Sequence, residues 1–183
     1  MTLPVANFFP SGKGKVLDIG AGTGRSTLAV LEARPDASLV AIDLFERSYA
    51  DHFGNISDAR IVENLREAGV LNRATVKKAD MRELPFPAGE FDAVISAYAI
   101  DHVGTAGIRK SLAEAARVSK PGSDFLLLVM NKDNWVRFIW GPVVLHGGTR
   151  PPQTWIALLN EAGFDVIEHG AQPFSLHFLA RRR

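Results

Sequence analysis

Three alternating glycines follow a short apolar run near the start of the chain. The apolar run ends at Ile19, and a helix-like pattern begins at Arg25. Between them lie Gly20, Gly22 and Gly24. Glycine is needed where a chain turns sharply and a ligand approaches the backbone closely. Because free N–H groups at a helix start favour a negatively charged ligand group, the spacing predicts a ligand-binding turn. A tight strand-to-helix turn without a ligand is the alternative.

Carboxylates accompany this turn and the ends of two further apolar runs. Asp18 lies inside the run before the glycines, Asp43 follows Val40-Ala41-Ile42, and Asp80 follows Ala79. Ligands bind outside the carboxyl ends of strands in open α/β sheets, and an acid at the second strand can accept hydrogen bonds from ribose hydroxyls. The pattern therefore indicates a ligand site at this end of the strands, with Asp43 where an acid can hold a ribose. Taken alone, Asp43 is equally well explained as an ordinary strand-end or N-cap acid.

The elements that must position these residues alternate between strand and helix. Helices between strands imply parallel pairing with right-handed crossovers, whereas the short link 170–173 implies an antiparallel final pair. The sequence thus predicts an α/β fold with a doubly wound, mostly parallel seven-stranded sheet and one antiparallel strand. We expect one domain over 1–183, with a short N-terminal lead at 1–14 and an irregular segment at 131–152. The expected strands are 15–19, 38–42, 74–79, 91–97, 125–130, 164–169 and 175–180, and the expected helices are 25–33, 57–68, 108–118 and 154–162.

Taken together, these motifs resemble class I S-adenosylmethionine-dependent methyltransferases, of the small single-domain bacterial type with a Rossmann-like fold. Residues 16–24 resemble the family's first motif, 91–97 its fourth-strand motif, and 117–122 the turn before its fifth strand. Ser119 and Ser123 depart from that last pattern. Dinucleotide sites usually space their glycines differently and lack the acid in the strand, which disfavours a nicotinamide dehydrogenase.

The resemblance implies methyl transfer from S-adenosyl-L-methionine. It implies that Asp18 organises the loop and the cofactor's amino group, that Asp43 holds the ribose, and that Asp80 accepts from the adenine amino group. Met81 has a soft side chain that can pack on the purine. We also expect Asn55 to cap the cofactor, although an ordinary turn explains that residue too. The full set of expected cofactor contacts is Asp18, Gly20, Ala21, Gly22, Gly24, Asp43, Leu44, Asn55, Asp80, Met81, Ala97 and Tyr98.

A histidine follows the fourth expected strand, where related enzymes border the transferred methyl group. His102 could serve as general base, because an unperturbed histidine pKa of about 6.5 suits proton removal at neutral pH. In the alternative, Asp101 or His102 only caps the next helix. A nucleophilic sulfur or nitrogen acceptor needs no base, since alignment with the methyl carbon then supplies most of the rate.

The irregular segment 131–152 leaves the fifth strand and holds aromatic residues among glycines and prolines. Three interpretations stay open: a lid over the acceptor, a hydrophobic cluster covering the sheet, or a surface for a homodimer or a membrane. The first makes Trp135, Trp140 and His146 the candidate pocket walls.

The acceptor is less well determined than the cofactor. We expect a small molecule, with a protein or RNA acceptor, or a non-catalytic cofactor-binding protein, as alternatives. Ser96-Ala97-Tyr98-Ala99 replaces the tetrad that holds base amino groups in nucleic acid methyltransferases, which argues against that substrate. The net charge of +1 gives no nucleic-acid signal, and the arginines at 181–183 are expected to be a solvated strand end.

Composition sets the remaining limits. The 183 residues include no cysteine, which excludes disulfides and a catalytic thiol and fits a cytoplasmic protein. Histidines are few and scattered, so no metal site is expected. No apolar run approaches the ~20 residues that cross a bilayer, and the first ten residues do not resemble a secretory signal.

Overall fold

The computed structural model describes residues 6–45, 57–131, 150–172 and 174–183. Its strands form one seven-stranded sheet with the order β3-β2-β1-β4-β5-β7-β6. β7 runs antiparallel to both of its neighbours, whereas the other pairs are parallel. The predicted topology is therefore confirmed. The strands are β1 (Gly14–Ile19), β2 (Ala37–Asp43), β3 (Ala74–Lys78), β4 (Phe91–Ala97), β5 (Ser119–Met130), β6 (Phe164–Gln172) and β7 (Ser175–Arg182).

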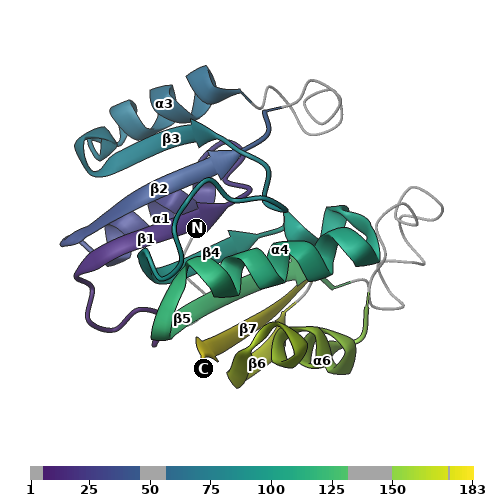
Figure 1. The fold of residues 1–183 in the computed structure, drawn as a ribbon. Coiled ribbons are helices and arrows are strands. Elements are labelled where there is room, and N and C mark those ends of the chain that lie inside the picture. Colours follow the sequence, from purple (N-terminus) through teal and green to yellow (C-terminus); the bar gives the residue numbers. More distant parts are fainter. Residues whose placement is uncertain (1–5, 46–56, 132–149, 173) are drawn as a thin grey trace.

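Helices cover both faces of this sheet (Figure 1). α4 and α6 pack on one face and α1 and α3 on the other, so the buried apolar side chains form two clusters separated by the sheet. β4 is buried on both faces at its centre, as its continuous apolar sequence predicted. The helices are α1 (Arg25–Ala33), α3 (Asp58–Glu67), α4 (Gly104–Val118) and α6 (Pro152–Ala162), with 3₁₀ turns η1 (Leu71–Arg73) and η2 (Ile100–His102).

Two elements begin four or more residues earlier than the sequence predicted. α4 starts at Gly104 rather than at 108, and its first turn includes Gly107, which packs closely on Val103, the residue preceding the helix. A Cβ on Gly107 would lie 2.9 Å from the Cβ of Val103. β5 starts at Ser119 rather than at 125, because Ser119 pairs with Phe91 before an irregularity in the ladder.

The ends of α3 agree with the predicted stop signals. The Ser57 hydroxyl accepts a hydrogen bond from the Arg60 N–H at 3.2 Å, which is the expected N-cap. Gly69, just beyond the helix, has a φ of +71°, a conformation that glycine adopts without steric cost.

The arginines at the end of β7 include exposed side chains, as expected of a solvated strand end, but they also make contacts that the sequence did not predict. Arg181 forms an ion pair with Asp124, its terminal nitrogen 3.0 Å from the carboxylate. Arg182 donates to the carbonyls of Ala116 and Gly163, both at 2.9 Å. These carbonyls belong to the last turn of α4 and to the residue after α6, where orphan carbonyls need donors. The arginines thus join the sheet to two helices.

Two absences hold for the described parts of the chain. Within them, no helix is both long and apolar enough to cross a membrane. Nor do the same residues bring together three or more side chains of the kinds that ligate metals.

Candidate cofactor-binding site

The glycine turn is held tightly against the neighbouring strands. The N–H groups of Gly20 and Ala21 both donate to the carbonyl of Ile42 in β2, at 2.9 and 3.0 Å. Gly20 has a φ of +74°, and a Cβ there would lie only 2.1 Å from the Cβ of Ala99. The residue after β1 must therefore be glycine, because the loop after β4 packs directly on it.

Asp18 is completely buried beneath this turn. One carboxylate oxygen, Oδ2, accepts hydrogen bonds from the hydroxyls of Ser26 and Thr27 at 2.7 and 2.6 Å. The other, Oδ1, is buried without a hydrogen-bond partner among the described residues. Burial raises the pKa of Asp18 to about 6, although the two hydroxyl donors act in the opposite direction. Ser26 and Thr27 follow the glycines directly in the sequence. Their hydrogen bonds to Asp18 could be recognised only in the structure, where the first turn of α1 directs both hydroxyls at the carboxylate.

Asp43 joins the end of β2 to the same turn. Its Oδ2 accepts a hydrogen bond from the Gly22 N–H at 2.9 Å, and its Oδ1 accepts one from the Phe45 N–H at 3.0 Å. Among the described residues, no atom would lie within 4 Å of a Cβ on Gly22. The second glycine therefore borders open space, whereas the first is enclosed by protein. Leu44, between Asp43 and Phe45 in the chain, is half-buried.

The residues after β3 reach the turn from the other side. The Cε of Met81 lies 3.6 Å from the position of a Cβ on Gly20. Asp80 forms an ion pair with Arg82 at 2.7 Å, and hydrogen bonds from that guanidinium hold the pKa of the Asp80 carboxyl below its usual range. Asp80 is partly exposed, so its carboxylate remains accessible at the edge of the sheet.

α3 packs against the glycine turn, a contact that no sequence pattern indicated. The amide of Asn64 donates to the carbonyl of Thr23 at 2.8 Å. A Cβ on Gly24 would lie 2.9 Å from the Cγ1 of Ile61, so the third glycine allows this helix to pack closely. A helix that follows in the sequence by more than thirty residues thus fixes the glycine turn.

The segment after β4 brings further predicted residues to the same end of the sheet. Ala97 is half-buried at the end of β4, and Tyr98 is exposed. Asp101 accepts a hydrogen bond from the Met130 N–H at 3.1 Å and lies 3.9 Å from the Nε2 of His102. Neither side chain caps the next helix, because the N-cap residue of α4 is Val103 and makes no side-chain hydrogen bond. The helix-cap interpretation of these two residues was therefore wrong.

Four predicted site residues lie outside the described part of the chain. They are Asn55, Trp135, Trp140 and His146. The structure thus brings together the predicted residues of β1, β2, β3 and β4, and the roles of the four stay predictions.

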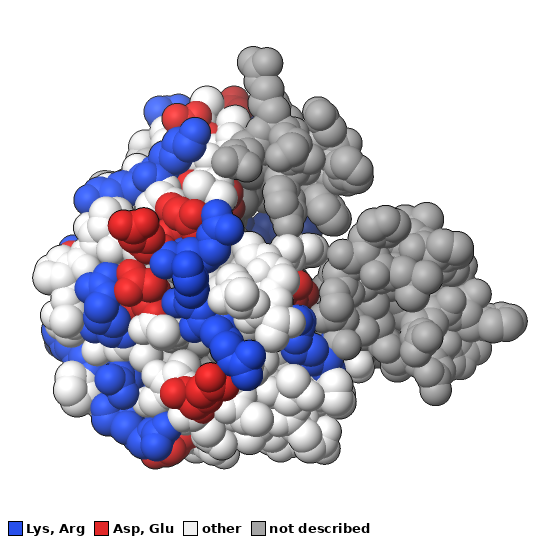
Figure 2. Space-filling model, turned by 45° about the vertical axis from the view of Figure 1, so that its right-hand side comes forward, with Lys and Arg blue, Asp and Glu red and all other residues white. Residues whose placement is uncertain are grey.

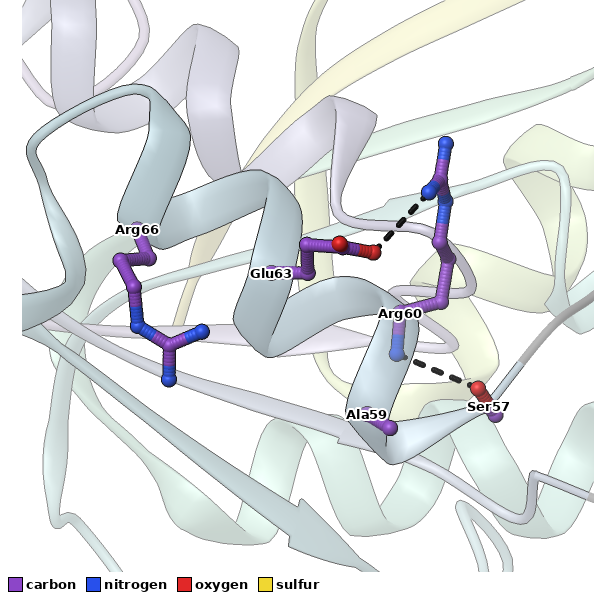
Figure 3. Close-up of a pocket in the computed structure, with 5 residues that line it drawn as sticks. All are labelled: Ser57, Ala59, Arg60, Glu63 and Arg66. Atoms are coloured by element: carbon purple, nitrogen blue, oxygen red, sulfur yellow. Dashed lines mark hydrogen bonds and ion pairs between the residues drawn. The ribbon is translucent and has the colours of Figure 1, made fainter.

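A surface depression lies elsewhere, on α3. It has a volume of about 370 Å³ and is lined by Ser57, Ala59, Arg60, Glu63 and Arg66 (Figure 3). Arg60 and Glu63 pair across one turn of the helix at 3.0 Å, and both side chains are about half exposed. Because these groups already neutralise each other at the surface, the depression offers no chemistry comparable to the glycine turn.

Charge is evenly mixed on the face that Figure 2 shows. Lys and Arg side chains lie among Asp and Glu side chains over the described surface, without a large area of one sign. Among the described residues as a whole, several basic groups are paired, including Arg82 with Asp80 and Arg109 with Glu161. This face therefore lacks the basic stripe that binding to a phosphate backbone requires.

Comparison with known proteins identifies the class that this geometry defines. The sequence model of a family described as methyltransferase domain matches residues 16–122, which is more than half of the chain. The match begins in β1 and ends in the first residues of β5, so it includes the glycine turn and all three acids. The chain belongs to this family and is a class I S-adenosylmethionine-dependent methyltransferase.

Individual relatives cover different shares of their own length. An uncharacterized methyltransferase of Synechocystis sp. is 29% identical over 174 residues, which are 90% of this chain and 73% of that protein. The ubiquinone/menaquinone biosynthesis C-methyltransferase UbiE of Syntrophotalea carbinolica is 33% identical over 64% of this chain, but only 44% of that protein. Among solved structures, mitomycin 7-O-methyltransferase MmcR matches with a TM-score of 0.76 and 22% identity, over 94% of this chain and 50% of that chain. That likeness shows the fold.

Proposed function

We propose that the chain binds S-adenosyl-L-methionine at the carboxyl ends of β1, β2 and β3 and transfers its methyl group to a small-molecule acceptor. One observation carries the cofactor site: among the described residues, Asp18 keeps a buried carboxylate oxygen without a partner, beneath a glycine turn in which none of them would lie within 4 Å of a Cβ on Gly22. A buried carboxylate oxygen needs a donor. The ammonium of the cofactor's methionine part is such a donor, so the residues fit the group.

Asp43 has capacity for the ribose hydroxyls in addition to its present bonds. Each carboxylate oxygen offers about two acceptor sites, and the N–H groups of Gly22 and Phe45 occupy one on each. One site on each oxygen is left, which suits two neighbouring hydroxyls. Asp80 and Met81 would hold the adenine. The remaining proposed contacts are Gly20, Ala21, Gly24, Leu44, Asn55, Ala97 and Tyr98.

When bound, the cofactor supplies an electrophilic methyl group on a sulfonium. The chain's own part in the reaction is to fix the two reactants. A well-oriented pair gains about 7–11 kcal/mol through proximity and alignment. The turn is suited to this because β2, the loop after β4 and α3 all hold it in place.

His102 is the proposed general base for an acceptor that must lose a proton. Its side chain is about one-fifth exposed, at the carboxyl end of β4, and it lies beside the nearly buried Asp101. We expect His102→Asn to lower kcat by about 10²- to 10⁴-fold with a hydroxyl acceptor. A pH-rate profile checks this role, because loss of the base also removes the acidic limb of the profile. An unchanged profile would show that alignment alone suffices.

The small-molecule acceptor is supported by relatives and by charge. The UbiE relatives are named for ubiquinone and menaquinone biosynthesis, whose products are small molecules. The mixed charge in Figure 2 does not favour a nucleic acid. The absence of cysteine from the sequence fits a cytoplasmic location.

Calorimetry tests the cofactor first. We expect S-adenosylmethionine and S-adenosylhomocysteine to bind and NAD not to bind. Asp43→Ala should weaken binding by about 10- to 150-fold, because a charged acceptor contributes about 1.5–3 kcal/mol. Asp36→Ala, at an exposed carboxylate before β2, is the matched control and should bind as the wild type does. Binding of NAD instead, or unchanged affinity in Asp43→Ala, would contradict the site.

A further inference from the structure

Tyr98 has an unusual backbone conformation at the end of β4. Its φ is +56°, which is in the left-handed region that residues with a side chain rarely adopt. Two hydrogen bonds hold it there: its N–H donates to the carbonyl of Leu128, and its hydroxyl donates to the Oγ of Ser175, both at 2.9 Å. Strain of this kind persists only where the surroundings enforce it, and it is concentrated at functional sites.

The position of Tyr98 connects two parts of the molecule. The next residue, Ala99, packs directly on Gly20 of the cofactor turn. In the other direction the Tyr98 side chain crosses the end of β5 to reach Ser175, the first residue of β7. Its ring therefore lies between the glycine turn and the β6–β7 connection.

Phe174 adds a second exposed aromatic ring at this place. It also has a left-handed backbone, with a φ of +68°, and its carbonyl accepts from the Asn131 N–H at 3.0 Å. Tyr98 is 39% exposed and Phe174 53%. The described residues include three large exposed apolar side chains, and the third, Ile167, belongs to the edge strand β6. Tyr98 and Phe174 therefore belong to two chain segments that the Tyr98–Ser175 hydrogen bond joins. Tyr98 precedes the residue that packs on the glycine turn.

We propose that Tyr98 and Phe174 form the receiving surface for a flat aromatic methyl acceptor that carries a hydrogen-bond donor. This inference rests on the proposed function and adds the chemical class of the acceptor. Exposed aromatic rings favour other flat rings through offset or edge-to-face contact, in addition to the apolar area that is buried. An aliphatic acceptor of equal size gains only the area term.

The Tyr98 hydroxyl favours an acceptor molecule that carries a hydrogen-bond donor. Because its proton is given to Ser175, its oxygen lone pairs remain as acceptors. They can take a hydrogen bond from an O–H or N–H of the bound ring. Ser175 is buried, with 7% exposure, so it acts as a positioning residue that orients the hydroxyl. Asp101 supports the same loop through its bond to the Met130 N–H.

Three probes test the class of acceptor, each titrated with S-adenosylhomocysteine at saturation for the variant in use. Indole is flat and has an N–H donor, 1-methylindole is flat without a donor, and decahydro-2-naphthol has a donor but is not flat. We expect indole to bind about 3- to 10-fold more tightly than 1-methylindole, the range for one hydrogen bond, and the alicyclic alcohol to bind most weakly.

Variants assign the effect to residues. Tyr98→Phe should abolish the preference for indole over 1-methylindole, and Ser175→Ala should reduce it. Phe174→Ala should weaken both flat probes about 3- to 10-fold while keeping their ratio, because it removes ring contact alone. Ile167→Ala is the matched control, since it removes an equally exposed apolar side chain from β6, and it should leave all three affinities unchanged.

The outcomes separate this inference from the proposed function. Failure of the wild type to bind S-adenosylhomocysteine overturns the proposed function and this inference with it. If S-adenosylhomocysteine binds, three results overturn this inference alone. They are no binding of either indole, equal affinity for the two indoles, and tighter binding of the alicyclic alcohol. Phe174→Ala keeps the test decisive even where a change at the strained Tyr98 impairs folding.

Discussion

At the scale of single residues, Asp18 has two opposing roles. Its Oδ2 links β1 to the start of α1 through two hydroxyls, which stabilises the turn. Its burial at the same time penalises the ionised form and raises its pKa from 3.8 to about 6. The ionised Asp18 carboxylate carries a desolvation penalty when no cation lies beside it. A cationic ligand group would offset part of that penalty, so the site is well suited to one.

The raised pKa predicts a stability that falls as pH rises. The folded chain holds the Asp18 proton to about pH 6, whereas the unfolded chain releases it near pH 3.8. The stabilisation is therefore complete below pH 3.8 and is lost as pH rises through 6. The shift corresponds to about 3 kcal/mol as an order of magnitude. Urea unfolding at several pH values should show that Asp18→Asn is less dependent on pH between 4 and 7 than the wild type.

Asp36→Asn is the control for this measurement, because Asp36 is exposed and its loss should leave the pH dependence unchanged. S-adenosylhomocysteine should in addition bind more tightly to the wild type above pH 6 than below it, since its ammonium favours ionised Asp18. Equal pH dependence of unfolding in the wild type and Asp18→Asn would show that Asp18 does not change protonation on folding.

At the scale of elements, the turn between β1 and α1 depends on what packs against each glycine. Gly20 faces Ala99, Gly24 faces Ile61, and Gly22 faces open space. All three have a positive φ. The three glycines therefore look alike in the sequence but carry different constraints, and single substitutions can tell them apart.

We expect Gly20→Ala to destabilise the fold by about 2–5 kcal/mol, from the positive φ and from overlap with Ala99. Gly22→Ala is the matched variant, because it has the same kind of backbone but no neighbour within 4 Å. It should lose only about 1–2 kcal/mol. Urea unfolding measures both, and equal losses would mean that the loop after β4 moves away without cost.

At the scale of the whole molecule, one buried carboxylate joins distant parts of the chain. Asp124 in β5 is 5% exposed, and its Oδ2 accepts from the Phe9 N–H at 2.9 Å. Its Oδ1 accepts from Arg181 in β7 at 3.0 Å. Phe8 and Phe9 are buried under the sheet, and Arg34 donates to the carbonyls of both. The N-terminal lead is thus part of the packed structure.

This arrangement predicts an asymmetric response to mutation. Asp124→Ala leaves the buried Phe9 N–H without a partner and should lower the free energy of unfolding by about 1–3 kcal/mol. Arg181→Ala should cost less than about 1 kcal/mol, because half of that side chain is exposed and the ion pair is screened. Denaturant unfolding of the two variants makes the comparison. A larger loss in Arg181→Ala would show that the ion pair, and not the Phe9 contact, anchors the lead.

The sequence alone determined the sheet and the class of protein. Hydrophobic runs and turn residues act locally, so the strand 91–97 and the helix 25–33 were predicted with their observed bounds. The glycines with Asp18, Asp43 and Asp80 follow the strand ends in order, and parallel pairing brings those ends to one edge. Periodicity and topology together therefore located the candidate cofactor site.

Only the tertiary structure decided which distant groups meet. Nothing in the sequence indicates that Asn64 holds Thr23, that Tyr98 reaches Ser175, or that the last arginines join β7 to two helices. These contacts join residues 19 to 77 positions apart, or fix side-chain directions that no periodic pattern encodes. Packing of α3 on the sheet and pairing of β7 within it bring these groups together, because helix and strand each bury apolar side chains there.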